Sequence, residues 1–178
     1  INKESVIGSV LNYATVKLEQ NARVELIKND LSSFTESKKV VDGELIEHSI
    51  TRKIAPSGTV TLASGASAGS IYGFKTVKLD NASANEVIFG DAYSEKYTLK
   101  NEKETTTRTN TRNGSVTATS STVGDITGYT TIKLTDSKAG DIYQTDISKI
   151  VDNEDITRKL AGTVTLVNSY TGNITNFT

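Results

Sequence analysis

An eleven-residue sequence motif recurs along this chain and constrains its fold more than any other feature. It reads GSVLNYATVKL from residue 8, GSIYGFKTVKL from residue 69 and GDITGYTTIKL from residue 124, and a partial copy, GNITNFT, starts at residue 172. The starting points are 61, 55 and 48 residues apart. Repetition at this spacing predicts a repeat protein, in which similar units stack on one another and share one core.

Each complete copy of the motif ends in a strand-like alternation of apolar and polar residues. In the first copy Val16 and Leu18 alternate with Thr15 and Lys17. This period of two predicts a half-buried strand whose Val and Leu side chains face the core. The first apolar position is predicted to form a column through the repeats: Val16, Val77 and Ile132. A branched residue six positions earlier is predicted to form a second column: Val10, Ile71, Ile126 and Ile174.

A Gly or an Asn, followed by an aromatic residue, lies between these two strands in every copy. Gly has no Cβ and Asn tolerates the left-handed region, so both fit a backbone position with positive φ. We therefore predict a left-handed corner at four positions: Asn12, Gly73, Gly128 and Asn176.

A shorter period lies inside the longer one. Val60 and Val77 are 17 residues apart, and the equivalent spacing in the next unit is 16. Two short strands separated by small polar residues fill this length, which is the size of one coil of a β-solenoid. The next buried position is expected eight residues after the last apolar residue of a strand in four copies: Leu26, Val87, Ile142 and Ile174.

The residues between the coils have the pattern of hairpins. KKVVDGELIEHSITRKIA, from residue 38, places the turn signal Asp42-Gly43 between two strand-like runs. KYTLKNEKETTTRTNTR, from residue 96, and KIVDNEDITRK, from residue 149, are degenerate versions with polar turns. Each unit is therefore predicted to contain one tight coil, one longer coil and a protruding hairpin of variable length.

These patterns predict an all-β fold, a β-solenoid of the parallel β-helix kind with protruding hairpins. Tandem small β-sandwich modules are the alternative, but such modules usually need about 100 residues. The predicted repeat units are 1–57, which is partial at its start, 58–113, 114–161 and the truncated 162–178, all within one continuous solenoid domain.

Charge and composition exclude several classes of function. Lys and Arg number 20 against 21 for Asp and Glu, so there is no basic footprint for nucleic acid. No run of about 18 apolar residues is present, which argues against membrane insertion of this segment. Cys is absent, so disulfides and thiolate metal sites are excluded. The first residues lack Met and do not resemble a signal peptide, so we expect a piece of a longer protein.

The search for catalytic residues finds His48, which is the single histidine and lies between Glu47 and Ser49 in the first predicted hairpin. A catalytic triad needs a nucleophile and an orienting carboxylate within hydrogen-bond reach of the histidine. No nucleophile-elbow motif accompanies His48, so we interpret it as a solvated strand residue.

The acidic residues do not match a metal motif. Asp152, Asn153, Glu154 and Asp155 form the densest acidic cluster, yet neither calcium loop pattern occurs there, and a polar hairpin turn is predicted. Asp125 and Asp141 occupy a repeat position that carries serine or asparagine in other copies. The sequence therefore predicts no catalytic residue, no cofactor-binding residue and no metal ligand.

Pairs of threonines separated by one residue raise the possibility of an ice-binding face. They are Thr59 and Thr61, Thr109 and Thr111, Thr117 and Thr119, and Thr163 and Thr165. Equivalent strands carry Lys17, Lys78 and Lys133, which interrupt a flat threonine array and are typical of strands kept soluble by lysine. Ice binding is a minor alternative.

The stretches GTVTLASGASAGSIYGFKTVKLDNASA, GSVTATSSTVGDITGYTTIKLTDSKAGDI and GTVTLVNSYTGNITNFT resemble the repeat regions of large bacterial surface or secreted adhesins. Their sequence pattern is similar to that of filamentous-haemagglutinin-like and autotransporter-like β-solenoid repeats. This resemblance covers essentially the whole chain. The resemblance implies an extracellular stalk or adhesive fibre at the bacterial cell surface and carries over no catalytic residue. The long polar hairpins depart from the compact coils of those families.

Two classes of function remain open. The first is a non-catalytic structural or adhesive array, whose partners are neighbouring repeats of the same chain or of like chains, with host or surface glycans as further candidates. The second is a carbohydrate-binding or carbohydrate-processing β-helix. Near-equivalent residues spread over every unit favour the array. Because Val164, Leu166 and Ile174 lie in a segment without a polar cap, we also expect the ends to associate with neighbouring repeats.

Overall fold

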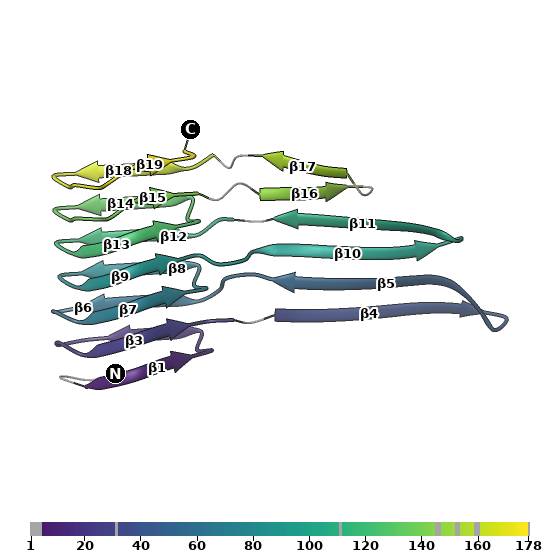
Figure 1. The fold of residues 1–178 in the computed structure, drawn as a ribbon. Coiled ribbons are helices and arrows are strands. Elements are labelled where there is room, and N and C mark those ends of the chain that lie inside the picture. The colour runs from purple at the N-terminus through teal and green to yellow at the C-terminus, as the bar shows by residue number, and fades with distance from the viewer. Residues whose placement is uncertain are drawn as a thin grey trace.

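The computed structural model describes residues 5–30, 32–110, 112–144, 147–151, 154–158 and 161–177. These residues form strands and turns but no helix, which confirms the predicted all-β class. It follows that no helix in these ranges is long and apolar enough to cross a membrane. The strands form three sheets, here called A, B and C. Sheets A and B lie face to face and together form one body, and sheet C projects from the side of this body as three hairpins (Figure 1).

Sheets A and B are parallel throughout. In spatial order sheet A contains β1 (Val6–Leu11), β3 (Arg23–Lys28), β7 (Ser67–Tyr72), β9 (Ser83–Ile88), β13 (Thr122–Thr127), β15 (Ile142–Tyr143) and β19 (Ile174–Thr175). Sheet B contains β2 (Thr15–Leu18), β6 (Thr59–Ala63), β8 (Thr76–Asp80), β12 (Ser115–Thr119), β14 (Thr131–Thr135) and β18 (Thr163–Val167).

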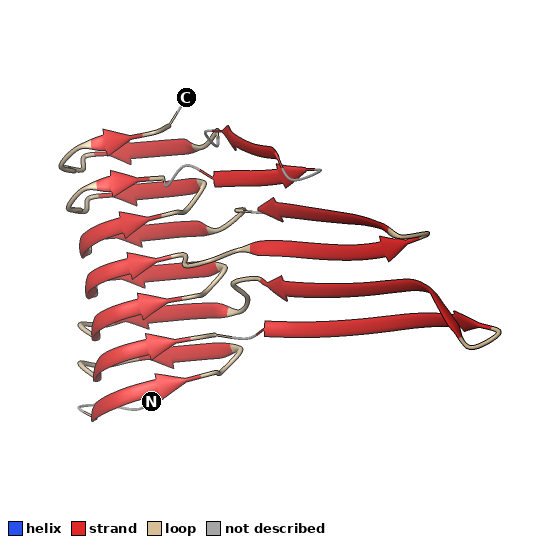
Figure 2. Ribbon diagram, turned by 45° about the vertical axis from the view of Figure 1, so that its right-hand side comes forward, coloured by secondary structure: helices blue, strands red, loops and turns tan. Residues whose placement is uncertain are grey.

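The chain alternates between these two sheets. We call a strand of sheet A together with the next strand of sheet B a layer, and layers follow one another in chain order (Figure 2). The pairing crosses the predicted unit boundaries, since β2 pairs with β6 and β14 pairs with β18. Strands that pair across the boundaries do not fit the alternative of separate sandwich modules.

The two predicted apolar columns are confirmed by the pairing register. In sheet A, Ile71 lies between Ile27 and Val87, and Ile126 lies between Val87 and Ile142. Ile71 and Ile126 are fully buried, whereas Ile174, on the last strand of this sheet, is 44% exposed. The column in sheet B is formed by Val16, Val60, Val77, Val116, Ile132 and Val164.

Two of the predicted buried positions are wrong: Ile174 is exposed on the last strand of sheet A, and Leu26 is not buried either. Leu26 is half-exposed and pairs with serines on either side, while Ile27 is fully buried. The reason is the length of the preceding corner. Gln20 and Asn21 both have positive φ there, whereas the corner before β9 has only Asn81 in that region. The extra residue moves the buried position from eight to nine residues after Leu18.

The four left-handed corners are confirmed. The φ angles are 59° at Asn12, 79° at Gly73, 79° at Gly128 and 65° at Asn176. The aromatic residue that follows turns into the core in the middle layers, where Phe74 and Tyr129 are fully buried. The Tyr129 hydroxyl donates a hydrogen bond to the carbonyl oxygen of Phe74 over 2.9 Å.

The opposite corner of the later layers is held by a ladder of serines that the sequence did not predict. The Ser121 Oγ accepts a hydrogen bond from the amide of Ala82, and the Ser137 Oγ accepts one from the amide of Ser121. The Ser169 Oγ continues the ladder by accepting from the amide of Ser137. Each serine thereby satisfies the backbone of the layer before it, as buried polar groups require.

Sheet C contains the predicted hairpins. In spatial order its antiparallel strands are β17 (Glu154–Arg158), β16 (Ile147–Val151), β11 (Lys103–Asn110), β10 (Tyr93–Lys100), β5 (Glu44–Ile54) and β4 (Ser32–Val41). The Asp42-Gly43 turn is confirmed, with φ of 52° and 84°, and Asn101 and Glu102 form a similar turn with φ of 48° and 64°. Positive φ at both central residues gives a type I′ turn, which suits a two-residue hairpin. The polar hairpin turn predicted at residues 152–155 falls partly outside the described residues, because residues 152–153 are not among them.

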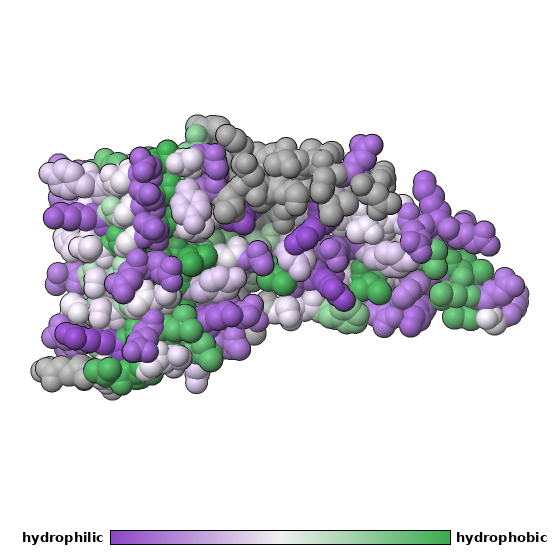
Figure 3. All heavy atoms as spheres, viewed as in Figure 1, coloured by the Kyte–Doolittle hydropathy of each residue, from purple (hydrophilic) through white to green (hydrophobic). Residues whose placement is uncertain are grey.

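Sheet C is a single layer. None of the core residues whose burial is described comes from its strands. The first hairpin extends furthest and ends in an exposed apolar group, Val40, Val41 and Leu45, which Figure 3 shows at the end of the protrusion. Sheets A and B therefore hold the described core, and sheet C depends on strand pairing and on contacts between side chains along its two faces.

Candidate functional site

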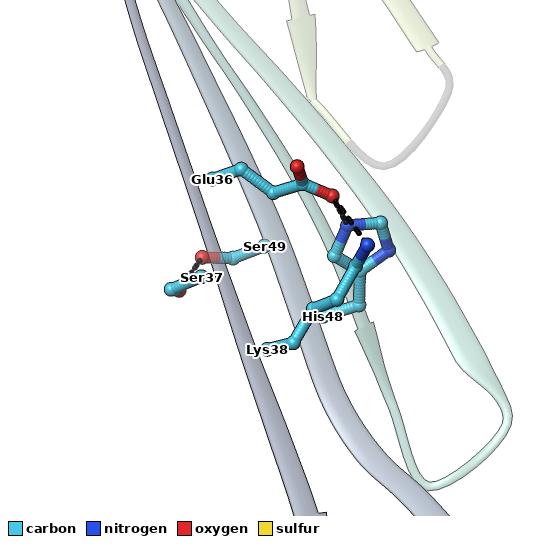
Figure 4. A network of polar contacts seen from close by, with 5 residues as sticks. All are labelled: Glu36, Ser37, Lys38, His48 and Ser49. Atoms are coloured by element: carbon cyan, nitrogen blue, oxygen red, sulfur yellow. Dashed lines mark hydrogen bonds and ion pairs between the residues drawn. The ribbon is translucent and has the colours of Figure 1, made fainter.

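The single histidine belongs to a polar network in the first hairpin (Figure 4). The His48 Nε2 lies 2.8 Å from the Glu36 Oε1, and the Lys38 Nζ lies 2.8 Å from the same oxygen. The His48 side chain is 19% exposed, and its ring meets the ring of Tyr97 edge to face at 6.2 Å between centroids. The network therefore links three strands, β4, β5 and β10.

The serine beside His48 does not face the histidine. Ser49 and Ser37 share a hydrogen bond of 2.9 Å between their hydroxyls. Successive side chains of a strand point to opposite faces, so Ser37 and Ser49 lie on the other side of the sheet from His48 and Glu36 (Figure 4). The pair formed by His48 and Glu36 has the base and carboxylate of a triad but holds no hydroxyl nucleophile from these serines.

Hydrogen bonds, burial and neighbouring charges set the ionisation of this network. The Lys38 ammonium donates a hydrogen bond to the Glu36 carboxylate and holds the pKa of that carboxyl below its ordinary value. The hydrogen bond with His48 lowers the same pKa to a smaller extent. On the next hairpin, burial and then the neighbouring Glu104 raise the pKa of the Tyr97 phenol. A carboxylate that is paired with Lys and a phenol that keeps its proton are suited to structural contacts more than to acid–base chemistry near neutral pH.

Asp125 and Asp141 cap the backbone of the next layer. The Asp125 Oδ1 accepts a hydrogen bond of 2.8 Å from the amide of Asp141, and the Asp141 Oδ1 accepts one of 2.7 Å from the amide of Asn173. These bonds give the aspartates a role in stacking the layers, in keeping with the serine and asparagine found at this position in other copies.

The acidic cluster near the third hairpin is described only in part. Asp152 and Asn153 lie outside the described residues, Glu154 is exposed at the start of β17, and Asp155 pairs with Ile150 across the hairpin. Among the residues that the structure describes, no three of His, Cys, Asp and Glu lie close enough together to hold a metal ion.

On the outer face of sheet B, the pairing register confirms that lysines interrupt the array of threonines, and it shows the order in which the two residue types follow one another. Lysine and threonine alternate on successive strands of sheet B. The strand at the end of each copy of the eleven-residue motif carries Lys, and the strands between these carry Thr. We call this column the lysine ladder: Lys17, Thr61, Lys78, Thr117, Lys133 and Thr165. The spacings of 16 and 17 residues contained the signal, because they place Thr61 beside Lys78 and Thr117 beside Lys133. Of the predicted threonine pairs, Thr109 lies in β11 and Thr111 lies outside the described residues.

A hollow at the root of the first hairpin is too small for a sugar. It encloses about 40 Å³ beside Asn29, Pro56 and Gly73, whereas pockets for small molecules usually have at least about 300 Å³. The Asn29 Nδ2 donates to the carbonyl oxygen of Ser57 over 3.0 Å, which ties this root to the layers.

Comparison of the chain with protein-family models, with curated proteins and with solved structures finds no match.

Proposed function

We propose that this chain is a stretch of a β-solenoid scaffold in a large bacterial surface or secreted protein, with a structural and adhesive role and no catalytic one. The observation that carries the proposal is the alternation of the chain between sheets A and B in layer after layer. Among the described residues, the strands of sheets A and B pair only with those of the layers beside them, so layers can be added without changing the core of the others. Such a fold is suited to length and stiffness.

The same pairing supports the finer assignment of a two-sided β-solenoid with protruding hairpins. The apolar columns run in register from layer to layer. In every second layer, a hairpin is inserted between the strand of sheet A and the strand of sheet B. Coils of a solenoid are expected to stack in this way, and insertions are expected at one corner of the coil.

The hairpins support a role in presentation at a surface. In sheet C, β4 is exposed along its length, and the longest hairpin ends in the apolar group of Val40, Val41 and Leu45. His48 faces Glu36 and Tyr97 and not a hydroxyl nucleophile, which favours the scaffold over a carbohydrate-processing enzyme. The partners of the scaffold are then neighbouring repeats, like chains and surface glycans.

Surface labelling of intact cells tests the location. An antibody raised against the β4–β5 hairpin should label unpermeabilised cells that make the protein, or their culture fluid, and protease added outside should remove the signal. Labelling that requires permeabilisation would contradict the proposal.

Turnover assays test the non-catalytic role. The chain should release no product from a panel of neutral and acidic polysaccharides. Product release that disappears in His48→Gln, with the fold preserved by circular dichroism, would assign an enzyme in place of a scaffold.

A further inference from the structure

The lysine ladder places positive charges at a regular spacing along the stacking direction. Adjacent strands of a sheet lie about 4.8 Å apart, so the lysines on alternate strands are about 9.6 Å apart. Lys17, Lys78 and Lys133 thus mark three points on one line, about 19 Å long. All three side chains are exposed, because the apolar neighbours in each strand face the core.

A column of hydroxyl groups runs beside the ladder on the same face. It occupies the position two residues earlier in each strand: Thr15, Thr59, Thr76, Ser115, Thr131 and Thr163. Each hydroxyl is both a donor and an acceptor, as are the hydroxyls of a sugar. The face therefore combines spaced ammonium groups with two lines of hydroxyls, counting the threonines of the ladder itself.

Carboxylates neutralise only part of the ladder. Lys17 forms an ion pair with Glu19, and Asp80 lies two residues after Lys78 on the same face. Within the described part of the chain, neither Lys78 nor Lys133 forms an ion pair with a carboxylate. Val167 and Thr135 occupy the position of Glu19 and Asp80 in the later strands, so the excess of positive charge increases along the ladder.

We propose that the lysine ladder binds an extended acidic polysaccharide that carries one carboxylate per disaccharide, lying along the stacking direction. Successive sugars of an extended β-linked chain face opposite sides, so carboxylates on every second sugar all face the same side. Their separation is one disaccharide, which matches the distance between the lysines. Each contact alone is weak, and binding depends on several contacts along one polymer.

The spacing favours this ligand over other polyanions. Duplex DNA carries one charge per about 1.7 Å of its axis, far denser than the ladder, and the chain has no net positive charge. A densely sulfated polysaccharide would leave most of its charges without a lysine. The inference rests on the proposed adhesive role and adds to it the class of glycan and the face that binds it.

Binding to immobilised hyaluronan, which alternates a uronic acid with a neutral sugar, tests the inference by biolayer interferometry at low and high salt. The double variant Lys78→Thr/Lys133→Thr should lose about tenfold or more in affinity. Threonine is the residue of the neighbouring strands, so these changes preserve the strand pattern. The matched control Lys39→Thr/Lys100→Thr removes two exposed lysines from sheet C and should change affinity by less than about twofold. Asp80→Asn should tighten binding.

Three results would overturn the inference. These are failure of the wild-type chain to bind hyaluronan at low salt, equal weakening of binding by the two double variants, and better competition by soluble heparin than by hyaluronan at equal polymer charge. Equal weakening or heparin preference would indicate binding by overall charge and not by spacing. Because none of these results alters the layered fold, scattering from the same samples separates failure of this inference from failure of the proposed scaffold.

Discussion

Single residues stabilise this chain through columns that repeat from layer to layer, and Ile126 is the clearest test of a column. It is fully buried between Val87 and Ile142. We expect Ile126→Ala to lower the free energy of unfolding by about 2–5 kcal/mol, because the truncation leaves a cavity that neighbouring layers cannot fill. Urea denaturation measures this loss. The control is Ile174→Ala in the same column, which is 44% exposed and should cost clearly less. Equal losses would contradict the column.

The corner glycines allow a matched comparison. Gly73 and Gly128 have the same φ of 79°, so an added Cβ costs each of them about 1–2 kcal/mol of left-handed strain. At Gly73 that Cβ would lie 1.9 Å from the backbone oxygen of Asn29, whereas at Gly128 it would lie 2.4 Å from the movable guanidinium of Arg112. We expect Gly73→Ala to destabilise the fold more than Gly128→Ala in thermal unfolding. The reverse order would show that the layers are not as close at Gly73 as described.

The Glu36 network predicts a pH dependence of the first hairpin. The pKa of Glu36 is held below the ordinary value of about 4.3, first by Lys38 and then by His48. A depressed pKa in the folded state means that the contact stabilises the hairpin above the ordinary pKa and is lost as the pH falls through the folded pKa. NMR titration should show the Glu36 pKa rising in Lys38→Ala by more than in His48→Gln. A larger effect of His48→Gln would contradict this order.

At the scale of the elements, the two kinds of sheet should differ in their protection from hydrogen exchange. Strands β7 and β8 hold buried residues such as Ile71 and Val77, whereas β4 is exposed along its length at the edge of sheet C. Opening of a segment costs less when few apolar contacts are lost, so the amides of β4 and β5 should exchange faster than those of β7 and β8. Mass spectrometry of the exchanging chain measures this order. Equal protection would contradict a single-layer sheet C.

Much of the element arrangement could be predicted because its signals are local. The alternation in Val16 and Leu18 and the Asp42-Gly43 turn each depend on neighbouring residues, and both are confirmed. The lysine ladder could be derived only in part in this way: short spacings place Thr61 beside Lys78, but Lys17 lies beside Thr61 only after a whole hairpin intervenes. The contact of His48 also depends on a register shift between Lys39 and Val40, which places Lys38 opposite His48. The extra residue is Ile46 in β5, and it leaves no mark in the sequence pattern, so counting residues back from the turn misplaces every pair beyond it.

At the scale of the whole molecule, the layers form one continuous stack, and the three hairpins form a second sheet beside it (Figure 1). Glycine begins each of the units 58–113 and 114–161 and the partial unit 162–178. An additional copy of residues 58–161 can therefore be inserted after Ala161 with the same residue type, Gly58, where Gly162 follows in the natural chain. The inserted residues supply four more strands to each of sheets A and B.

The central claim, that layers stack along one axis and can be repeated, is tested most directly by small-angle X-ray scattering of the chain with and without this insertion. Four added layers should lengthen the particle by about 19 Å at 4.8 Å per layer, with the cross-sectional radius unchanged. Growth in all dimensions, or separate modules that move independently, would contradict the account.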